Sequence, residues 1–331
     1  MMLKEGKPPR EILENIVYRH LSFRDPDLVI GPAIGEDAGI VRLSDGFLVS
    51  HSNPITVASR FAGWLSVHVA CNDVAVRGAK PRWLLTTILL SPGTREEELE
   101  EIVRQTGEAA KSIDTVIIGG HTETTPGLPR TIIVTTAIGY TKNRVIKTRD
   151  AMPGDKVIVV GPIGGEGASV IAWDFEDELR KKGIDEDIIE KAKSFVKNVS
   201  VVDKALKLAP YVSSMHNPTE GGILEGLLEV AIASNNTIVV DLGKIDIDPV
   251  VMEVTKPFKI DPLKLLSSGS LIATIPEYNL EKALSILEKN NVSYSICGEV
   301  KSGPPVLVVR RRDKEDIISE TIIDEIYKIW S

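Results

Sequence analysis

The sequence contains little cysteine, no long hydrophobic run and no surplus of positive charge. Its two cysteines, Cys71 and Cys297, stand far apart, and no set of cysteines and histidines has the spacing of a four-ligand zinc site. This pattern excludes a disulfide framework and a zinc site, and it favours a reducing compartment. Residues 1–10 are charged and interrupted by proline, unlike a signal peptide, and no segment approaches the roughly 18 apolar residues of a membrane span. We therefore predict a cytoplasmic protein with no membrane partner.

The charge balance also excludes a class of partner. The 331 residues include 39 Lys and Arg against 47 Asp and Glu, a net charge of −8. A protein that binds nucleic acid needs a basic face, and the only basic cluster, the three arginines at 310–312, is followed by acidic residues. We predict no nucleic-acid partner. A hydrophobic content of 43% with 26% charged residues is typical of a soluble globular protein, and the length predicts two domains.

The most informative stretch is an apolar segment from residue 61 to residue 76, which predicts a mostly buried helix. Gly78 and Pro81 end it, so Asn72 and Asp73 fall in its last turns. A carboxylate is unfavourable there, because the helix dipole repels it and burial removes its water. Either Arg77, four residues on, pairs with Asp73, or Asp73 binds a hard cation such as Mg²⁺. A single carboxylate makes no metal site, so the second hypothesis needs ligands from elsewhere.

Other polar residues stand where predicted elements of a first domain end. Residues 9–21 have helical spacing, and Asp37 follows in a glycine-punctuated turn that could equally be a plain surface turn. A strand at 46–51 precedes Asn53, and a strand at 115–118 precedes Gly119, Gly120, His121 and Glu123. Strands at 82–90 and 130–140 and a helix at 94–112 complete this domain.

We place a domain boundary after residue 149, giving domains 1–149 and 150–331. A strand at 156–160 leads into a glycine loop with Gly164 and Gly165 and then a helix, a geometry that binds an anion or is only a tight turn. Before a second helix, at 223–234, stand His216, Asn217, Gly221 and Gly222. This start also suits an anion or its metal, although a lone histidine is more often half-buried and satisfied. Strands at 271–275, 293–300 and 306–310 follow.

Five short motifs occur in one order along the chain: Gly35-Glu36-Asp37-Ala38, Asn72-Asp73 with Gly78-Ala79-Lys80-Pro81, Gly119-Gly120-His121-Thr122, Pro153-Gly154-Asp155, and Asn217-Pro218-Thr219-Glu220-Gly221-Gly222. With these motifs the chain resembles the aminoimidazole ribonucleotide synthetase superfamily over nearly its whole length. The Pro-Thr-Glu-Gly-Gly motif and residues 267–270 are most similar to the HypE-related (hydrogenase maturation) branch, archaeal type.

The resemblance implies a fold and a cofactor. We expect an α+β protein of two α/β domains, in which a mixed sheet of the N-terminal domain forms a β-barrel across a homodimer. The C-terminal α+β domain would close a cleft for ATP and Mg²⁺. Members of the superfamily phosphorylate an oxygen of an amide, carbamoyl group or phosphate ester, and Mg²⁺ with several carboxylates stabilises the phosphoryl group in transfer.

The sequence departs from this superfamily at three places. Asn53 and Asn217 stand where members usually have Asp, and His121 replaces an acidic residue, with Glu123 nearby as a compensating group. HypE ends in a cysteine that carries the carbamoyl group, whereas this sequence ends in Trp330-Ser331. The expected protein is therefore HypE-like but without that nucleophile.

These considerations predict ATP- and Mg²⁺-dependent activation of a small-molecule or protein-borne substrate, by phosphoryl transfer or dehydration. The alternative is a nucleotide-binding regulatory or maturation partner with little turnover, and a thiamine monophosphate kinase fits the C-terminal motifs less well. The resemblance implies catalytic roles for Asp73, His121, Glu123 and Asn217, and Asp37 and Asp73 as metal ligands. It implies cofactor contacts from Asp37, Asn53, Asn72, Gly119, Gly120, Gly164, Gly165, Gly221 and Gly222.

Overall fold

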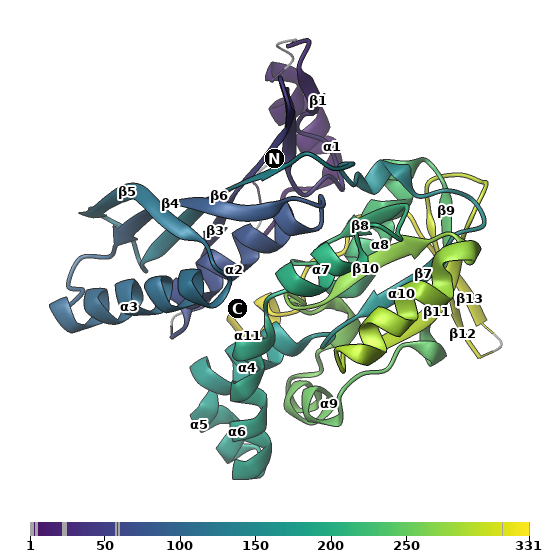
Figure 1. Cartoon of the computed structure of the whole chain (residues 1–331). Helices are drawn as coiled ribbons and strands as arrows, with labels where there is room; N and C mark the ends of the chain where they lie inside the picture. The colour runs from purple at the N-terminus through teal and green to yellow at the C-terminus, as the bar shows by residue number, and fades with distance from the viewer. Residues whose placement is uncertain are drawn as a thin grey trace.

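The computed structural model describes residues 3, 6–21, 25–56, 58, 60–312 and 314–330, with only the backbone of Trp330. The chain forms two domains, each built on a mixed β-sheet with helices packed against it (Figure 1). This confirms the predicted two-domain α+β class. Within the described residues, no helix is long and apolar enough to span a membrane.

The N-terminal sheet has six strands, all antiparallel to their neighbours except the parallel pair β4 and β5. Helices α2 (Ala62–Ala75) and α3 (Glu96–Ser112) pack together beside it (Figure 1). The spatial order of the strands is β1 (Leu28–Ile30), β2 (Gly39–Leu43), β3 (Gly46–Ile55), β6 (Ile132–Thr141), β4 (Lys80–Leu90) and β5 (Val116–Thr124).

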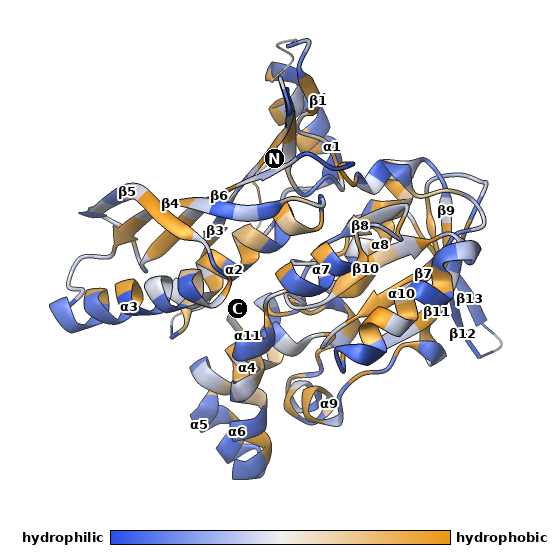
Figure 2. Ribbon diagram, in the orientation of Figure 1, coloured by the Kyte–Doolittle hydropathy of each residue, from blue (hydrophilic) through white to orange (hydrophobic). Residues whose placement is uncertain are grey.

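The C-terminal sheet has seven strands and one parallel pair, β12 with β9. Its order is β13 (Lys314–Ile318), β12 (Leu307–Arg311), β9 (Thr237–Asp241), β11 (Tyr294–Lys301), β7 (Lys156–Val160), β10 (Leu271–Ile275) and β8 (Ser214–His216). The helices are α4 (Gly165–Asp174), α5 (Glu176–Lys181), α6 (Glu186–Ser194), α7 (Val202–Leu208), α8 (Gly222–Ser234), α9 (Pro249–Thr255), α10 (Glu277–Lys289) and α11 (Tyr327–Trp330). The peripheral helices α3, α5 and α6 are largely hydrophilic (Figure 2).

Helix α2 of the N-terminal domain packs against the C-terminal domain. All but one of its residues are buried, as its apolar sequence predicts, and Gly78 follows it with φ +77°, the left-handed conformation that glycine adopts without strain. One hydrophobic cluster includes Val67 and Val74 of α2 together with Ala205 of α7 and Leu271 of β10. The domains therefore share a core, in which α2 packs against helix α7 of the C-terminal domain.

Several predicted elements have different bounds in the structure. The segment predicted as a helix at 9–21 is a short α-turn, α1 (Arg10–Ile12), continued by π- and 3₁₀-helical turns to His20. Strand β3 continues to Ile55 and β5 to Thr124, beyond the predicted ends. Residues that we expected in loops at the ends of strands therefore lie within strands.

Candidate functional site

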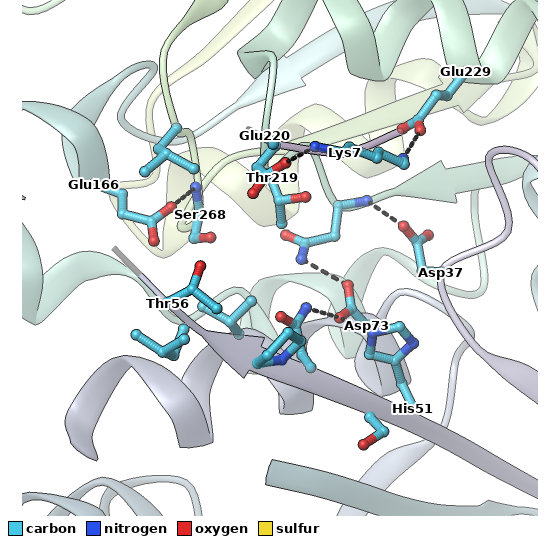
Figure 3. A pocket seen from close by; sticks show the side chains of 18 of the residues that line it. Lys7, Asp37, His51, Thr56, Asp73, Glu166, Thr219, Glu220, Glu229 and Ser268 are labelled. Atoms are coloured by element: carbon cyan, nitrogen blue, oxygen red, sulfur yellow. Dashed lines mark hydrogen bonds and ion pairs between the residues drawn. The ribbon is translucent and has the colours of Figure 1, made fainter. Parts of the chain in front are cut away.

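A cavity of about 570 Å³ lies between the two domains, within the size range of small-molecule sites. Strand β3 and helix α2 supply one wall, α4 and the loops around β8 and β10 supply the other, and Lys7 enters from the N-terminal segment. Figure 3 shows side chains from these elements pointing into a shared space. Its acidic side chains, which outnumber the one lysine and two histidines in the lining, are Glu36, Asp37, Asp73, Glu166, Glu220 and Glu229.

Asp73 lies on the buried end of α2 and faces this cavity. Its carboxylate accepts hydrogen bonds from the side-chain amides of Asn217, at 2.8 Å, and Asn53, at 3.2 Å (Figure 3). His51 Nε2 lies 3.2 Å from Asp73 Oδ2. Burial raises the pKa of Asp73, while His51 lowers it and the nearby Asp37 raises it further. Two asparagines and a histidine thus provide the partners that a buried carboxylate requires.

Arg77 does not pair with Asp73, so the simple ion-pair hypothesis for this helix end is wrong. Its guanidinium is fully buried and binds Asp37 Oδ2 through Nη2 and Glu36 Oε2 through Nη1, the latter at 2.9 Å. It also donates to the carbonyl of Met215, in β8 of the other domain. The Arg77 side chain extends toward the loop between β1 and β2, because the carboxylates of Glu36 and Asp37 are buried there and need a positively charged partner in place of water.

His216 holds the opposite side of Asp37. Its Nδ1 lies 2.8 Å from Asp37 Oδ1, close enough for an ion pair although not aligned for a hydrogen bond, and its Nε2 lies 2.8 Å from Glu229 Oε2. Burial lowers the pKa of His216, but the two carboxylates outweigh burial and raise it to about 10. The imidazole is therefore a cation at neutral pH, and it is fully buried rather than half-buried as expected for a lone His, with a carboxylate beside each ring nitrogen.

Lys7 connects the N-terminal segment to this network. Its Nζ binds Glu229 Oε1, and its backbone N–H donates to Glu220 Oε2 at 3.1 Å. Burial raises the pKa of Glu229, but Lys7 and His216 outweigh it and hold the value at about 2. Glu229 is thus ionised, and it ties the N-terminal segment to α8.

The residues around Asp73 fit a hard cation. Mg²⁺ takes carboxylate and carbonyl oxygens, and Asn217 Oδ1 is a buried oxygen without a hydrogen-bond partner among the described residues. Asp73, Asn53 and Asn217 could hold such an ion, and the surplus of acidic side chains would repel a triphosphate that arrives without cations. Asp37 does not fit as a direct ligand, because each of its oxygens already faces a buried cation. We therefore revise its predicted role from metal ligand to an anchor for Arg77 and His216.

Comparison with known proteins identifies the family. The family model described as AIR synthase related protein, N-terminal domain, matches residues 35–141, and that for the C-terminal domain matches residues 152–310. The chain belongs to the AIR synthase-related family. This finding confirms the resemblance recognised in the sequence motifs.

Similar proteins include a putative hydrogenase expression/formation protein of Methanocaldococcus jannaschii, 26% identical over 96% of this chain and 92% of that protein. Thiamine-monophosphate kinase of Pyrococcus horikoshii is 29% identical over 85% of this chain and 87% of that protein. The crystal structure of hydrogenase maturation protein HypE in complex with ATP shares the fold, with a TM-score of 0.73 and 23% identity over 99% of this chain and 98% of that one.

The glycine loop before α4 does not offer free backbone donors. Gly164 adopts φ +67°, and its N–H donates to Ser267 Oγ at 3.0 Å, while the N–H of Gly165 donates to the carbonyl of Pro162 at 3.1 Å. Neither glycine lines the cavity. We therefore revise the predicted phosphate contact of Gly164 and Gly165. In this member of the AIR synthase-related family the loop is a tight turn, the alternative considered from the sequence.

At the start of α8, too, the backbone N–H groups of the glycines bind acceptors within the chain. The N–H of Gly221 donates to Asp324 Oδ2 at 2.8 Å, and that of Gly222 donates to the carbonyl of Thr219 at 3.1 Å. The anion expected at this helix start is the chain's own Asp324 carboxylate. Burial raises the pKa of Asp324 to about 7, although the N–H groups of Ile326 and Gly221 act against that shift.

Asn72 is also placed differently from the prediction. Its carboxamide donates to the carbonyl of Val199 at 2.7 Å and accepts from the N–H of Val201 at 2.8 Å. Both of its polar ends are thus engaged by the C-terminal domain, and it does not line the cavity. Asn72 fastens the two domains together, and we revise its predicted contact with the cofactor accordingly.

The residues at 119–123 lie on β5, away from the cavity within one chain. His121 Nε2 and Glu123 Oε2 are 3.2 Å apart, and both side chains are exposed. Gly119 and Gly120 are strand residues, and a Cβ on Gly120 would lie 1.8 Å from the carbonyl oxygen of Thr86 on β4. Close packing of two strands, rather than a cofactor loop, explains the glycine at 120.

The structure brings together Asp37, Asn53, Asp73 and Asn217 from the predicted set. It also places in the cavity residues that the sequence interpretation missed, among them Lys7, Glu166, Glu220, Glu229 and Ser268. Signals were available for three of them: Glu166 is the acid within the glycine loop, Glu220 belongs to the motif at 217–222, and Ser268 belongs to residues 267–270. Lys7 and Glu229 lie in a charged N-terminal segment and a helix without distinctive spacing.

Proposed function

We propose that this protein binds ATP with Mg²⁺ in the cavity between its domains. With this cofactor it would activate an oxygen of an amide, carbamoyl or phosphate-type substrate by phosphoryl transfer or dehydration. The observation that carries the proposal is the cluster of Asp73, Asn53 and Asn217 in an acidic cavity of suitable size. Similarity to a HypE crystallised with ATP and to a thiamine-monophosphate kinase supports it.

The chain's own residues would share this work. When bound, Mg²⁺ neutralises phosphate charge and stabilises the phosphoryl group in transfer. Asp73, Asn53 and Asn217 would hold the ion, and Lys7 supplies a positive charge at one end of the cavity. Arg77 and His216 would keep Asp37 and the loop that carries Asn217 in place.

We further propose that the protein is a cytoplasmic homodimer in which the N-terminal sheets form a barrel. All nine residues of β5 are exposed, including Val116 and Ile118, and Trp83 and Leu85 are exposed on the neighbouring β4. An exposed edge strand with apolar side chains requires cover. His121 and Glu123 would then lie at the interface and could complete the partner's cavity.

A regulatory or maturation partner with little turnover is the second candidate. The observation that favours it is that two neutral amides, those of Asn53 and Asn217, bind the Asp73 carboxylate. Asn offers Mg²⁺ a weaker ligand than Asp, so nucleotide binding could persist while phosphoryl transfer becomes slow.

Calorimetry separates these candidates. We expect the wild type to bind ATP with Mg²⁺ and to hydrolyse it slowly, and Asn53→Asp with Asn217→Asp to raise metal affinity and turnover together. Unchanged metal affinity in the double variant would mean that these positions do not face the metal. Brisk hydrolysis by the wild type would remove the regulatory candidate, and absence of ATP binding would refute the proposed function.

A further inference from the structure

A second pocket, of about 300 Å³, adjoins the cavity between the domains. Both spaces are lined by Tyr18, Ala33, Ile34 and Glu36, so the loop between β1 and β2 forms part of the wall of each. The other walls of the second pocket come from the N-terminal helical turns, the end of α8 and the segment between the domains. The residues proposed to hold Mg²⁺ do not line it. It is thus a separate space, at the lower end of the size range of small-molecule sites.

Two arginines reach this pocket with unengaged donors. Arg10 donates through Nε to Glu14 Oε1 at 2.8 Å, and Arg149 donates through Nε to Glu36 Oε1 at 2.8 Å. Among the described residues, no hydrogen bond or ion pair engages the Nη groups of either arginine. The two side chains are 40% and 43% exposed, so these groups can reach a ligand. A guanidinium presents paired N–H donors that match the two oxygens of a carboxylate.

Glu36 lines the pocket but does not oppose an anion there. Its side chain is 1% exposed, and both of its oxygens already accept hydrogen bonds. Its Oε1 is bound by Arg149, and its Oε2 accepts from Arg77 at 2.9 Å and from the N–H of Thr148 at 3.2 Å. Two arginines therefore neutralise this carboxylate.

The charges around the pocket leave a surplus of one positive charge. Arg77 also binds Asp37, but His216 balances that second carboxylate from its other side. Glu14 is 44% exposed and paired with Arg10, so solvent screens its charge. Three arginines thus meet two glutamates, and this balance favours a ligand with a single negative charge.

The rest of the wall is largely apolar. It consists of the ring of Tyr18 and the side chains of Pro32, Ala33, Ile34, Ile232 and Ala233. The loop that supplies part of it is fixed in place, because Gly35 has φ +77° and a Cβ there would lie 2.6 Å from the carbonyl oxygen of Glu229 on α8. Apolar surface beside a pair of cationic donors favours an anion that carries an apolar body.

We propose that this pocket is a binding site for a small monocarboxylate with an apolar body. The Nη groups of Arg10 and Arg149 bind the carboxylate, and the apolar body packs against Ile34 and Ile232. A dianion carries more charge than the pocket balances, and a neutral amide lacks the charge that the two guanidinium groups attract.

Ligand-observed NMR on the full chain tests this site with four probes. They are 3-phenylpropanoate, its uncharged analogue 3-phenylpropanamide, acetate and methyl phosphate. We expect 3-phenylpropanoate to bind at least about tenfold more tightly than each of the others, because it alone combines one negative charge with an apolar body.

Two substitutions locate the bound probe. Arg10→Gln and Arg149→Gln each remove a positive charge and a pair of N–H donors, and each should weaken 3-phenylpropanoate at least about tenfold. Arg149→Gln also loosens Glu36, whereas Arg10 forms only an exposed ion pair, so Arg10→Gln keeps the fold. The matched control is Arg104→Gln on α3, which removes another arginine paired with glutamates but lies outside the pocket. The affinity for 3-phenylpropanoate should be unchanged in this control.

The outcomes separate the ligand class from the location of the site. If the amide, acetate or methyl phosphate binds as tightly as 3-phenylpropanoate, the assigned ligand class is wrong. Full affinity in Arg10→Gln or in a folded Arg149→Gln overturns the site, as does an equal loss in Arg104→Gln. A wild type that does not bind 3-phenylpropanoate refutes the proposal outright. None of these measurements uses ATP, so they decide the site whether or not the proposed function holds.

Discussion

Replacing Arg77 should show how much the buried charge network contributes to stability. Its guanidinium is fully buried and donates to Glu36, Asp37, the hydroxyl of Thr148 and the carbonyl of Met215. These partners come from the loop before β2, the segment between the domains and β8. Arg77→Met keeps an unbranched side chain of similar length but removes every donor and the charge.

The expected cost follows from what remains after the substitution. Removing one partner of a buried ion pair costs about 3–5 kcal/mol, because the other charge stays buried without compensation. Here Glu36 keeps Arg149, whose Nε lies 2.8 Å from Oε1, and Asp37 keeps His216. We therefore expect the lower end, about 3 kcal/mol. Arg77→Lys should lower the free energy of unfolding by roughly half as much, because the lysine ammonium keeps the charge but lacks the planar set of donors of the guanidinium.

Urea unfolding followed by tryptophan fluorescence measures this cost. With an m-value of about 3 kcal/mol/M, the midpoint of Arg77→Met should fall by about 1 M. The control is Arg104→Met on the exposed face of α3, where Arg104 binds Glu101 and Glu108 in water and should contribute almost nothing. Equal midpoints for Arg77→Met and the wild type would refute the view that this network holds the two domains together.

Two further predictions follow from the C-terminal segment and from β5. The folded protein binds a proton on Asp324 more tightly than the unfolded chain, since the pKa rises from 3.8 to about 7. The wild type should therefore lose stability between pH 4 and 7, by up to about 1.4 kcal/mol per pH unit from this group. Asp324→Asn should flatten this slope in urea titrations, and parallel slopes would contradict the assignment. In sedimentation, Ile118→Lys should convert a dimer into a monomer, whereas Ile317→Lys, also at an exposed isoleucine, should not. A persistent dimer in Ile118→Lys, or a monomeric wild type, would argue against the barrel.

Much of the fold could be predicted from local sequence. The end of α2 followed from Gly78 and Pro81, because backbone conformation and a missing N–H act within a few residues. The motifs along the chain gave the family and its two-domain architecture. Strand ends were less certain, and the glycine pair at 119–120 was taken for a loop because a close approach between strands leaves the same local pattern as a turn.

The sequence by itself thus determined the two domains and the buried helix whose last turns contain Asn72 and Asp73, and the family resemblance in its motifs implied that Asn53 and Asn217 belong to the same site as Asp73. Only the tertiary structure decided which partner each polar group has. Arg77 reaches Asp37 rather than Asp73, and Asn72 binds the C-terminal domain. Segments far apart in sequence supply these partners, and a buried donor or acceptor bonds to whatever complementary group the packing brings within about 3 Å. Spacing along the chain carries no information about that choice.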